Sequence, residues 1–515
     1  MAKKHVTVEH LEYGRQDLDV EDKETLRTMS NEIPADQLAA KFEQAEARRI
    51  VRKVDLRLVP LLAFLFLIVQ IDRTNIGNAN IAGMPQDLHL TGPQFNLAVS
   101  IFFVPYALLE VPSNIVLKML RPSIWISILC FSWGTVMTLM GIVSNRQGLY
   151  ICRVFLGVFE SGFFPAAMYL LTIWYQRYEV QRRMSVVFSS AALAGAFSGL
   201  LAYGIEHMEG IAGFGGWRWI FILEGLFPVA FSFFLYFILP DSPQTASFLT
   251  KPEREFLVNR VALQNSGYHN TYVTNTDKIQ WRYIKAAFLE WKTWASIIPD
   301  LASTTGVYGF TATVPTVIQQ LGYTSTNAQL MTIPIYLVAT IATLLVGWLS
   351  DRLKQRTPFI MGCLSIAVIG FVAELAIPHP KFPGVTYFFL FFIAVGLFSP
   401  VTSIITLTAN NVAPSSKRAV GMAIMLSLGN LGGVCGGNIY LAHQKPKYQT
   451  GFAVSLGFCV AGIIMAAVLR VAYRRENEKR DELLAREGEE RVRAWYTDQE
   501  LLEMGDRSPF FRYTL

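Results

Sequence analysis

Charged residues are scarce in this sequence. Only 16% of its 515 residues are Asp, Glu, Lys or Arg, whereas 52% are hydrophobic. A soluble chain of this length carries about 25% charged residues, so the composition predicts an integral membrane protein surrounded by a lipid bilayer. The net charge of +6 comes from basic residues beside apolar runs. This is typical of membrane topology, and we expect no nucleic-acid partner.

The sequence also lacks the usual signatures of enzymes and metal sites. Its five cysteines all lie in apolar runs, in an odd number and without metal-ligand spacing, which indicates packing and neither a disulfide framework nor a redox motif. No Ser-His-Asp pattern or phosphate-cradling loop is present, and the histidines lie mostly in loops or at the ends of apolar runs. We therefore expect no enzyme activity, no cofactor and no metal.

What the chain has instead is a set of apolar runs long enough to cross a bilayer, which takes ~20 residues. They fall at about 56–76, 94–117, 122–143, 149–174, 183–205, 217–239, 293–319, 325–349, 357–377, 385–410, 418–441 and 450–473. These runs predict an all-α membrane protein with twelve transmembrane helices. No signal peptide is recognised before the first run, so this run is expected to act as its own insertion signal.

A polar segment divides the runs into two sets of six. The predicted parts are an N-terminal segment 1–55, a six-helix bundle 56–239, a central loop 240–292, a second six-helix bundle 293–473 and a C-terminal tail 474–515. Two six-helix halves joined by a long loop are typical of transporters with parallel repeats. Basic residues gather after the even-numbered runs, which places both termini and the central loop in the cytoplasm.

The most informative charges lie inside the apolar runs. Asp72 and Arg73 stand in the first run, and Arg153 and Glu160 in the fourth. A charged side chain near the bilayer centre costs at least ~2.5–3.5 kcal/mol, so we expect these groups to face a wet cavity or a partner helix. Arg153 and Glu160 are almost two helical turns apart, on one face and ~10 Å apart in height. A static cluster of interhelical salt bridges is the alternative interpretation.

One consistent arrangement pairs Arg153 with Asp72 and leaves Arg73 aimed into the cavity. The planar fork of a guanidinium matches a carboxylate in a bidentate manner, which suits the capture of a carboxylate substrate. A substrate that occupies the arginine would make Glu160 hold a proton more readily. Substrate and proton binding would then reinforce one another.

Other polar residues at membrane depth are weaker candidates. The side chains that could line the cavity and bind substrate are Asn75, Tyr308, Asn411 and Asn430. Glu110 and Asn114 lie one turn apart in the second run and serve either gating or packing. Asp300 is a candidate second proton site, but its closeness to Trp291 and Trp294 favours an interfacial position. Pro315 and Pro334, with nearby glycines, are expected to interrupt runs seven and eight.

Several motifs carry a resemblance to a known superfamily. The segment G-W-L-S-D-R-L-K-Q-R, residues 347–356, is similar to the cytoplasmic-loop signature between helices 8 and 9 of the major facilitator superfamily. The chain resembles this superfamily over about 50–475, which implies its fold of two pseudo-symmetric six-helix bundles. The resemblance assigns gating roles to Gly347, Asp351, Arg352 and Arg356. The counterpart after helix 2 lacks the Asp-Arg pair, and Asn114 stands where an acid is common.

More narrowly, the chain looks like the fungal branch of the anion:cation symporter family, that of allantoate and nicotinate permeases. The motifs that carry this likeness include I-D-R-T-N-I-G-N-A from Ile71, F-V-P-Y-A-L-L-E-V-P-S-N from Phe103 and G-W-R-W-I-F-I-L-E-G from Gly216. In related symporters, charged residues of helices 1 and 4 carry proton and substrate. By resemblance, these roles fall on Asp72, Arg73, Arg153 and Glu160, with Asp72 and Glu160 as the proton-coupling residues.

The expected function is therefore the proton-coupled uptake of a small organic anion, a carboxylate such as nicotinate or allantoate, by alternating access. The expected partners are this anion and protons, and the expected form is a monomer in the plasma membrane. Two alternatives stay open. One is an exporter of an acidic metabolite that uses the same site in the opposite direction, and the other is a nutrient sensor that does not transport.

Overall fold

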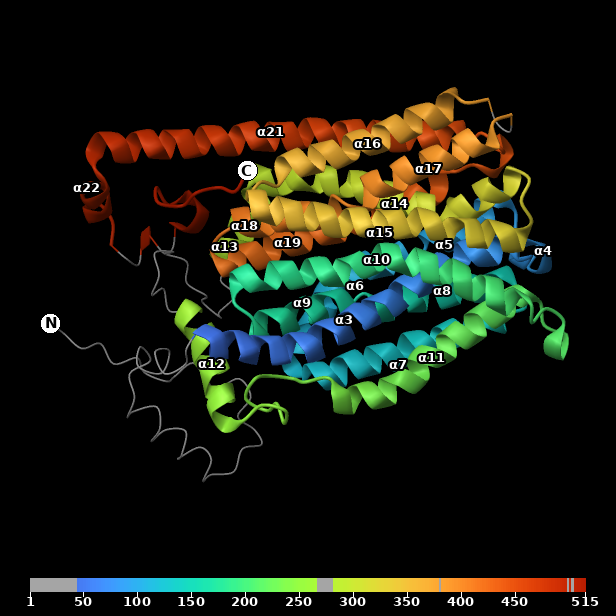
Figure 1. Ribbon diagram of the computed structural model, residues 1–515, viewed down its shortest axis with the longest axis horizontal. Helices are drawn as coiled ribbons and strands as arrows, with labels where there is room; N and C mark the ends of the chain where they lie inside the picture. Colours follow the sequence, from blue (N-terminus) through green and yellow to red (C-terminus); the bar gives the residue numbers. More distant parts are fainter. Residues whose placement is uncertain (1–43, 266–280, 379–380, 498–499, 502–503) are drawn as a thin grey trace.

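The computed structural model describes residues 44–265, 281–378, 381–497, 500–501 and 504–515 (Figure 1). Its regular elements are α-helices and three short 3-10 helices, and the described residues contain no strand. The helices lie side by side along the long axis of the molecule. The predicted all-α membrane fold is therefore confirmed.

In the described residues of the first half, nine helical segments form a bundle. They are α3 Gln44–Ile81, α4 Met84–Asp87, α5 Gly92–Ser100, α6 Phe103–Met119, α7 Pro122–Gly141, α8 Arg146–Glu160, α9 Phe163–Trp174, α10 Arg177–Glu206 and α11 Gly216–Ile238. The short elements η1 Ile211–Gly213, α12 Lys251–Asn265 and α13 Trp281–Leu289 complete this part of the chain. Most of its buried apolar side chains form one core, built around large residues such as Trp133, Trp174 and Phe221, and a small separate cluster lies between α10 and α11.

The second half also consists of helices. Its helices are α14 Trp291–Gln320, α15 Ser325–Leu353, α16 Thr357–Ala376, α17 Pro383–Phe398, α18 Val401–Asn411, α19 Ser415–Asn430, α20 Gly432–Ile439 and α21 Gln449–Glu487. The short elements η2 Ala442–Gln444, α22 Glu489–Ala494 and η3 Gly505–Arg507 follow in chain order around them. A second apolar core holds this half together, and Ala192 and Ala196 of α10 contribute to it from the first half.

Eleven helices of the described chain are long and apolar enough to cross a membrane. The run expected at 293–319 corresponds to α14, which is 30 residues long but is not among the eleven. Its sequence explains this difference, because α14 carries many Ser, Thr and Gly residues as well as Asp300. This polar helix packs between α21, α20, α19 and α3, at the centre of the molecule.

The interruptions of the helices lie elsewhere than expected. Both α14 and α15 run unbroken through Pro315 and Pro334, so the predicted breaks in runs seven and eight are wrong. A proline removes one backbone hydrogen bond, and tertiary packing can hold such a helix together. The actual breaks separate α5 from α6, α8 from α9, α17 from α18 and α19 from α20. Interrupted helices at membrane depth are tolerated where protein or a cavity satisfies the freed backbone groups.

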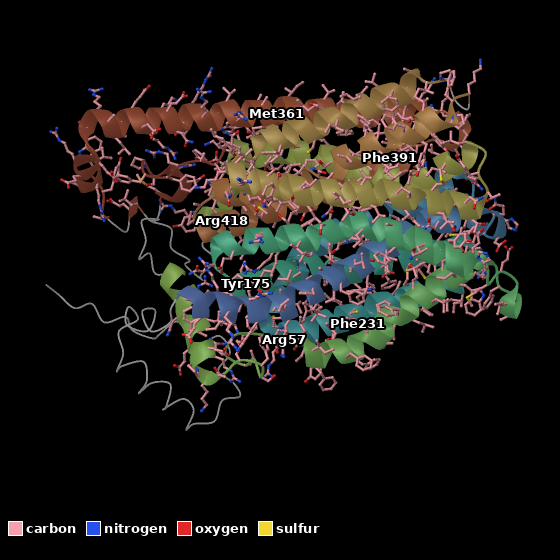
Figure 2. All side chains as sticks on the ribbon, viewed as in Figure 1. Arg57, Tyr175, Phe231, Met361, Phe391 and Arg418 are labelled. Carbon is pink, nitrogen blue, oxygen red and sulfur yellow. The ribbon has the colours of Figure 1, made fainter. Side chains whose placement is uncertain are left out.

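The two ends of the bundle differ. We call the end with α12, α13 and α22 the terminal end, and the end with α4, η1 and η2 the far end (Figure 1). Figure 2 shows Arg57, Tyr175 and Arg418 toward the terminal end, whereas Phe231 and Phe391 lie on helices along the bundle. At the terminal end, Arg183 pairs with Asp55 at 2.5 Å and Arg57 lies 4.6 Å from the ring of Phe248.

Candidate functional site

A cavity of about 110 Å³ lies between the two halves. Helices α3, α5, α6, α8, α9 and α10 line it from the first half, and α14, α15, α17, α18 and α19 from the second. Its charged lining residues are Arg73, Arg153 and Asp300. The aromatic residues around these charges are Phe66, Phe102, Phe103, Tyr106, Phe164, Phe188, Tyr308 and Phe398. Such an aromatic cavity with a few convergent polar groups is typical of a small-molecule site.

Arg73 joins the two halves at this cavity. Its Nε donates a hydrogen bond to Glu160 Oε2 at 2.7 Å, which is also an ion pair between α3 and α8. Its Nη1 donates to the hydroxyl of Tyr308 on α14 at 3.1 Å. The guanidinium also lies 4.6 Å from the ring of Tyr106. Since Tyr308 donates to Asn430 Oδ1 at 3.3 Å, a continuous chain of contacts crosses from one half to the other.

Arg153 also lines the cavity, but its guanidinium makes fewer hydrogen bonds than that of Arg73. Its Nε donates to the backbone carbonyl of Ala98 at 3.0 Å, and its guanidinium lies 5.1 Å from the ring of Phe102. Its Nη1 is buried and has no hydrogen-bond partner in the described chain. One turn further along α8, Gly157 allows α8 to approach the start of α6, because a Cβ there would lie 2.2 Å from the carbonyl oxygen of Phe102.

The expected pairing of Arg153 with Asp72 is wrong in this conformation. Asp72 is fully buried, and both of its carboxyl oxygens have no partner among the described residues. It does not line the cavity, whereas its neighbour Arg73 does. Adjacent residues of a helix point about 100° apart. The rotation of α3 that brings Arg73 to Glu160 therefore turns Asp72 into the interior of the first half.

Behind the cavity, α3 carries a second buried polar network. Asn75 Nδ2 donates to Glu224 Oε2 on α11, and Asn75 Oδ1 accepts from Ser198 of α10 at 2.9 Å. Asn78 Nδ2 donates to the same Ser198 hydroxyl at 2.7 Å. This network ties three helices together. Glu224 lies inside the sixth apolar run, where an acid is expected to anchor its helix, and the hydrogen bond to Asn75 agrees with this expectation.

The predicted substrate-binding residues lie in different places. Tyr308 and Asn430 line the cavity together with Arg73 and Arg153. Asn75 does not line it and instead belongs to the network with Glu224. Asn411 also lies outside the lining. Its side chain exchanges two hydrogen bonds with the backbone of Thr514, one at 2.9 Å and one at 2.7 Å.

The predicted gating residues lie toward the terminal end. Asp351 and Arg356 form an ion pair at 2.5 Å, and Arg352 lies 5.3 Å from the ring of Trp348. Gly347 faces Ser185 of α10 across the two halves, since a Cβ there would lie 3.7 Å from it. Glu110 accepts a long hydrogen bond of 3.4 Å from Ser427 of α19. The side chain of Asn114, in α6, lies outside the described residues.

At the far end, the two halves are in close contact. Asn96 of α5 donates to the carbonyl of Tyr440 at 3.4 Å, and Asn80 of α3 donates to Thr316 of α14 at 3.2 Å. The approach is so close that a Cβ on Gly92 would lie 2.6 Å from the side chain of Ala442. These contacts close the cavity toward the far end.

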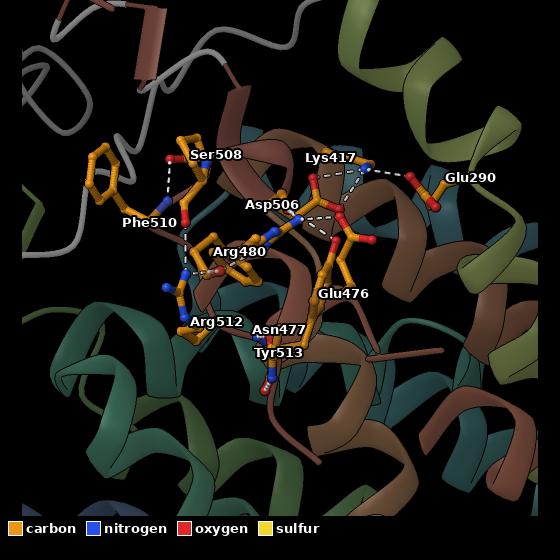
Figure 3. A network of polar contacts seen from close by, with 12 residues as sticks. Glu290, Lys417, Glu476, Asn477, Arg480, Asp506, Ser508, Phe510, Arg512 and Tyr513 are labelled. Carbon is orange, nitrogen blue, oxygen red and sulfur yellow. Dashed lines mark hydrogen bonds and ion pairs between the residues drawn. The ribbon is translucent and has the colours of Figure 1, made fainter. Parts of the chain in front are cut away.

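The C-terminal residues form a second cluster of buried charges at the terminal end (Figure 3). We call it the tail clasp, and it consists of Glu290, Lys417, Arg480, Asp506 and Tyr513. Lys417 Nζ contacts both carboxyl oxygens of Asp506, at 2.8 and 2.9 Å, and Glu290 at 3.2 Å. Arg480 and Tyr513 donate to the backbone carbonyl of Asp506 at 2.9 and 3.0 Å. Burial raises the pKa of Asp506, and Lys417 opposes that rise.

Within the described ranges, no group of three His, Cys, Asp or Glu side chains could hold a metal ion. The polar groups of the cavity are two guanidiniums, a carboxyl, hydroxyls and amides. This donor set is suited to an organic anion, because guanidiniums bind carboxylates through paired, charge-assisted hydrogen bonds.

Comparisons with known proteins define the family. The sequence pattern of the Major Facilitator Superfamily matches residues 62–437. The chain is 35% identical over 484 residues to the MFS-type transporter cnsO of Penicillium expansum, which covers 92% of each chain. It is 32% identical over 466 residues to the high-affinity nicotinic acid transporter of Saccharomyces cerevisiae, covering 90% of this chain and 84% of that one. The chain belongs to the Major Facilitator Superfamily, as its motifs predicted.

A solved structure shows the same fold. A bacterial homologue of the human lysosomal transporter Spinster, in an inward-facing and occupied conformation, aligns with a TM-score of 0.60 at 17% identity. The alignment covers 81% of this chain and 96% of that one. Membership in this superfamily makes the chain a multi-pass membrane protein and a secondary transporter, and not an enzyme.

Proposed function

We propose that this transporter takes up a small organic anion together with a proton by alternating access. The observation that carries the proposal is the ion pair between Arg73 and Glu160 at the cavity, beside the unpartnered Nη1 of Arg153. A second carboxylate can bind this unpartnered donor of Arg153 and break the neighbouring ion pair between Arg73 and Glu160. The likeness to a nicotinic acid transporter makes nicotinate the first anion to test.

Binding of the anion uses both arginines. The carboxylate of the cargo accepts from Arg153 Nη1 and competes with Glu160 for Arg73. The rings of Phe102 and Tyr106, which already contact these guanidiniums, form an apolar surface against which a flat cargo can stack. Tyr308 and Asn430, which belong to the second half, also contact the cargo. The bound anion therefore bridges the two halves of the transporter.

The proton follows from the loss of the ion pair. Glu160 is fully buried, and one of its carboxyl oxygens already lacks a partner. Once the cargo holds Arg73, Glu160 is left as a buried, unpaired charge, which is strongly unfavourable. Protonation removes this penalty, so anion and proton bind with positive coupling. Asp72 is the second proton site of the proposal, because a carboxyl without partners is buried at much lower free energy when it is neutral.

Release reverses these steps. When the cargo leaves, Arg73 returns to Glu160, and the restored ion pair expels the proton. A monoanion that travels with one proton moves no net charge, so the pH gradient drives its accumulation. Each further proton would add ~2.3 kcal/mol per 100 mV of membrane potential.

The basic residues of the terminal end favour a cytoplasmic position for that end, because positively charged flanks stay inside. Both termini would then be cytoplasmic, and the plasma membrane is the proposed location. The far end, where the halves meet, would face outward. Gly347, Asp351, Arg352 and Arg356, with Glu110 and Asn114, are the proposed inner gate.

The proposal is tested by radiolabelled nicotinate uptake as a function of external pH. Wild-type uptake should rise as the external pH falls, and Glu160→Gln should lose this dependence, because a glutamine cannot exchange a proton. Glu374→Gln is the matched control, since Glu374 is also a buried glutamate but lies on α16, which does not line the cavity. Unchanged acid stimulation in Glu160→Gln would contradict the proposal.

The same assay separates the alternatives. Lower internal accumulation in transporter-expressing cells than in a deletion strain would indicate export. Intact binding without any flux would indicate a sensor.

A further inference from the structure

A third charged group lines the cavity, and the proposed mechanism does not use it. Asp300 of α14 is only 2% exposed. Its carboxyl group has no hydrogen-bond or ion-pair partner in the described part of the chain, although it lies on the cavity wall. The carboxyl therefore faces the cavity between the two halves and not the outer surface of the bundle. A buried carboxyl that faces a cavity without a partner is suited to bind a donor group of a ligand.

The fold holds this carboxyl in a defined place. Gly429 of α19 lies directly against it, so close that a Cβ at this position would be 1.8 Å from Asp300 Oδ2. One turn along α14, the hydroxyl of Thr304 donates to the carbonyl of Gly429 at 2.7 Å. Helices α14 and α19 are thus joined beside Asp300, and the absence of a side chain on Gly429 makes the room in which the carboxyl lies.

The two halves consequently contribute different charged groups to the cavity, basic groups from one side and an acidic group from the other. The first half contributes the guanidiniums of Arg73 and Arg153, and the second half contributes the carboxyl of Asp300. Phe103 and Tyr308 lie between them, with their rings 4.4 Å apart. Glu110 of α6 is close enough to Asp300 to interact with it electrostatically.

The spacing of these groups limits the length of a ligand that reaches both. Tyr308 is the partner of Arg73 on α14, and Asp300 precedes Tyr308 by eight residues. Eight residues correspond to ~12 Å of helix. The two contacts are thus separated along the backbone of α14, and a ligand that reaches both walls has two polar ends with an apolar or aromatic middle part between them.

We propose that Asp300 is a second recognition point, which binds a hydrogen-bond-donating or cationic nitrogen of the cargo. The preferred cargo is then bipolar, with a carboxylate at the arginines and an N–H or ammonium group at Asp300. This inference rests on the proposed function, because it takes the arginine wall as the carboxylate site. A carboxyl accepts from such a nitrogen whether or not it is protonated, since its carbonyl oxygen keeps acceptor capacity.

Three matched pairs of acids test this inference on the purified full-length protein. The bipolar compounds are 4-aminobenzoate, 4-(aminomethyl)benzoate and 3-(4-aminophenyl)propionate, which increase in length. Their partners without nitrogen are benzoate, 4-methylbenzoate and 3-phenylpropionate. Affinities are measured by competition against radiolabelled nicotinate. A site with an unpaired acceptor should bind at least one of the nitrogen compounds at least ~10-fold more tightly than its partner.

The variant Asp300→Ala should abolish this advantage while it leaves the binding of the three simple acids in place. Ser303→Ala, a change on the same helix at a buried residue outside the cavity lining, should retain the advantage. Equal affinities within all three pairs in the wild-type protein would overturn the inference, even if Asp300→Ala did not fold, and would leave the proposed function intact. If none of the six acids nor nicotinate binds, the proposed function itself fails, and this inference fails with it.

Discussion

The cavity and the tail clasp both bury charged side chains, but only in the clasp do all of these side chains have hydrogen-bond or ion-pair partners. Lys417 has three oxygen atoms of two carboxyl groups within 3.2 Å, and Arg480 donates to two backbone carbonyls. In the cavity region, both oxygens of Asp72, Oε1 of Glu160 and Nη1 of Arg153 have no partner among the described residues. The two clusters are buried to a similar extent. The charged groups of the clasp have polar partners, whereas several of those in the cavity region do not.

This difference separates a structural role from a functional one. A completely bonded cluster has nothing left to offer a ligand, and its effect is to hold elements together. An incomplete cluster is expensive to bury, and polar groups of this kind within membrane helices mark substrate and proton pathways. We therefore expect the clasp to contribute to stability and the cavity to contribute to transport, and substitutions in each should affect different measurements.

The largest effect is expected at Arg73. Arg73→Ala removes the partner of Glu160 and the donor to Tyr308, so nicotinate uptake should fall at least ~100-fold, in the range of ~2–5 kcal/mol for a truncated buried charge pair. Arg73→Lys keeps the charge but loses the planar fork, and it should recover only part of the uptake. Uptake by Arg73→Ala at more than half of the wild-type rate, at equal protein amounts, would contradict the transport role of the cavity.

A similar change in the clasp should affect stability instead. Lys417→Ala leaves Asp506 buried without its cation, which should lower the free energy of unfolding by ~3–5 kcal/mol. Thermal unfolding of the purified protein measures this loss. The double variant Lys417→Met/Asp506→Leu removes both charges and should lose much less. If the double variant is as unstable as the single one, the charge pair is not the reason for the loss.

The smallest effect is expected at Asn411, which the sequence assigns to the substrate site but which the structure places against the C-terminal residues. Asn411→Ala removes the two hydrogen bonds to Thr514, each contributing about 1 kcal/mol. Hydrogen exchange in residues 505–515 should therefore become faster, while nicotinate uptake stays at the wild-type level. Reduced uptake with an unchanged exchange rate of these residues would instead return Asn411 to the substrate site that its sequence position indicated.

Much of this arrangement was predictable from the sequence. Helix positions follow from apolar runs because crossing a bilayer requires a minimum length of apolar residues. The position of Arg73, Arg153 and Glu160 at a cavity or against a partner helix, and not toward lipid, follows from the high free energy of charges at membrane depth. These two signals are local, so a single sequence carries them.

The partners of these charges were not predictable. Asp72 and Arg73 are adjacent, and only the rotation of α3 in the packed bundle decides which of them reaches Glu160. The contact between Asn411 and Thr514 joins residues 103 positions apart, which no periodicity reports. The tryptophans near Asp300 along the chain indicate a position near the membrane interface, whereas its contact with Gly429 depends on how α14 and α19 pack.

The central claim is that an anion and a proton together replace the ion pair between Arg73 and Glu160. Isothermal titration of nicotinate into the purified protein, in buffers with different ionisation enthalpies, counts the protons taken up on binding. The wild-type protein is predicted to take up about one proton per bound anion, and Glu160→Gln to bind nicotinate with none. Binding to the wild-type protein without proton uptake, or equal uptake in both proteins, would contradict the account.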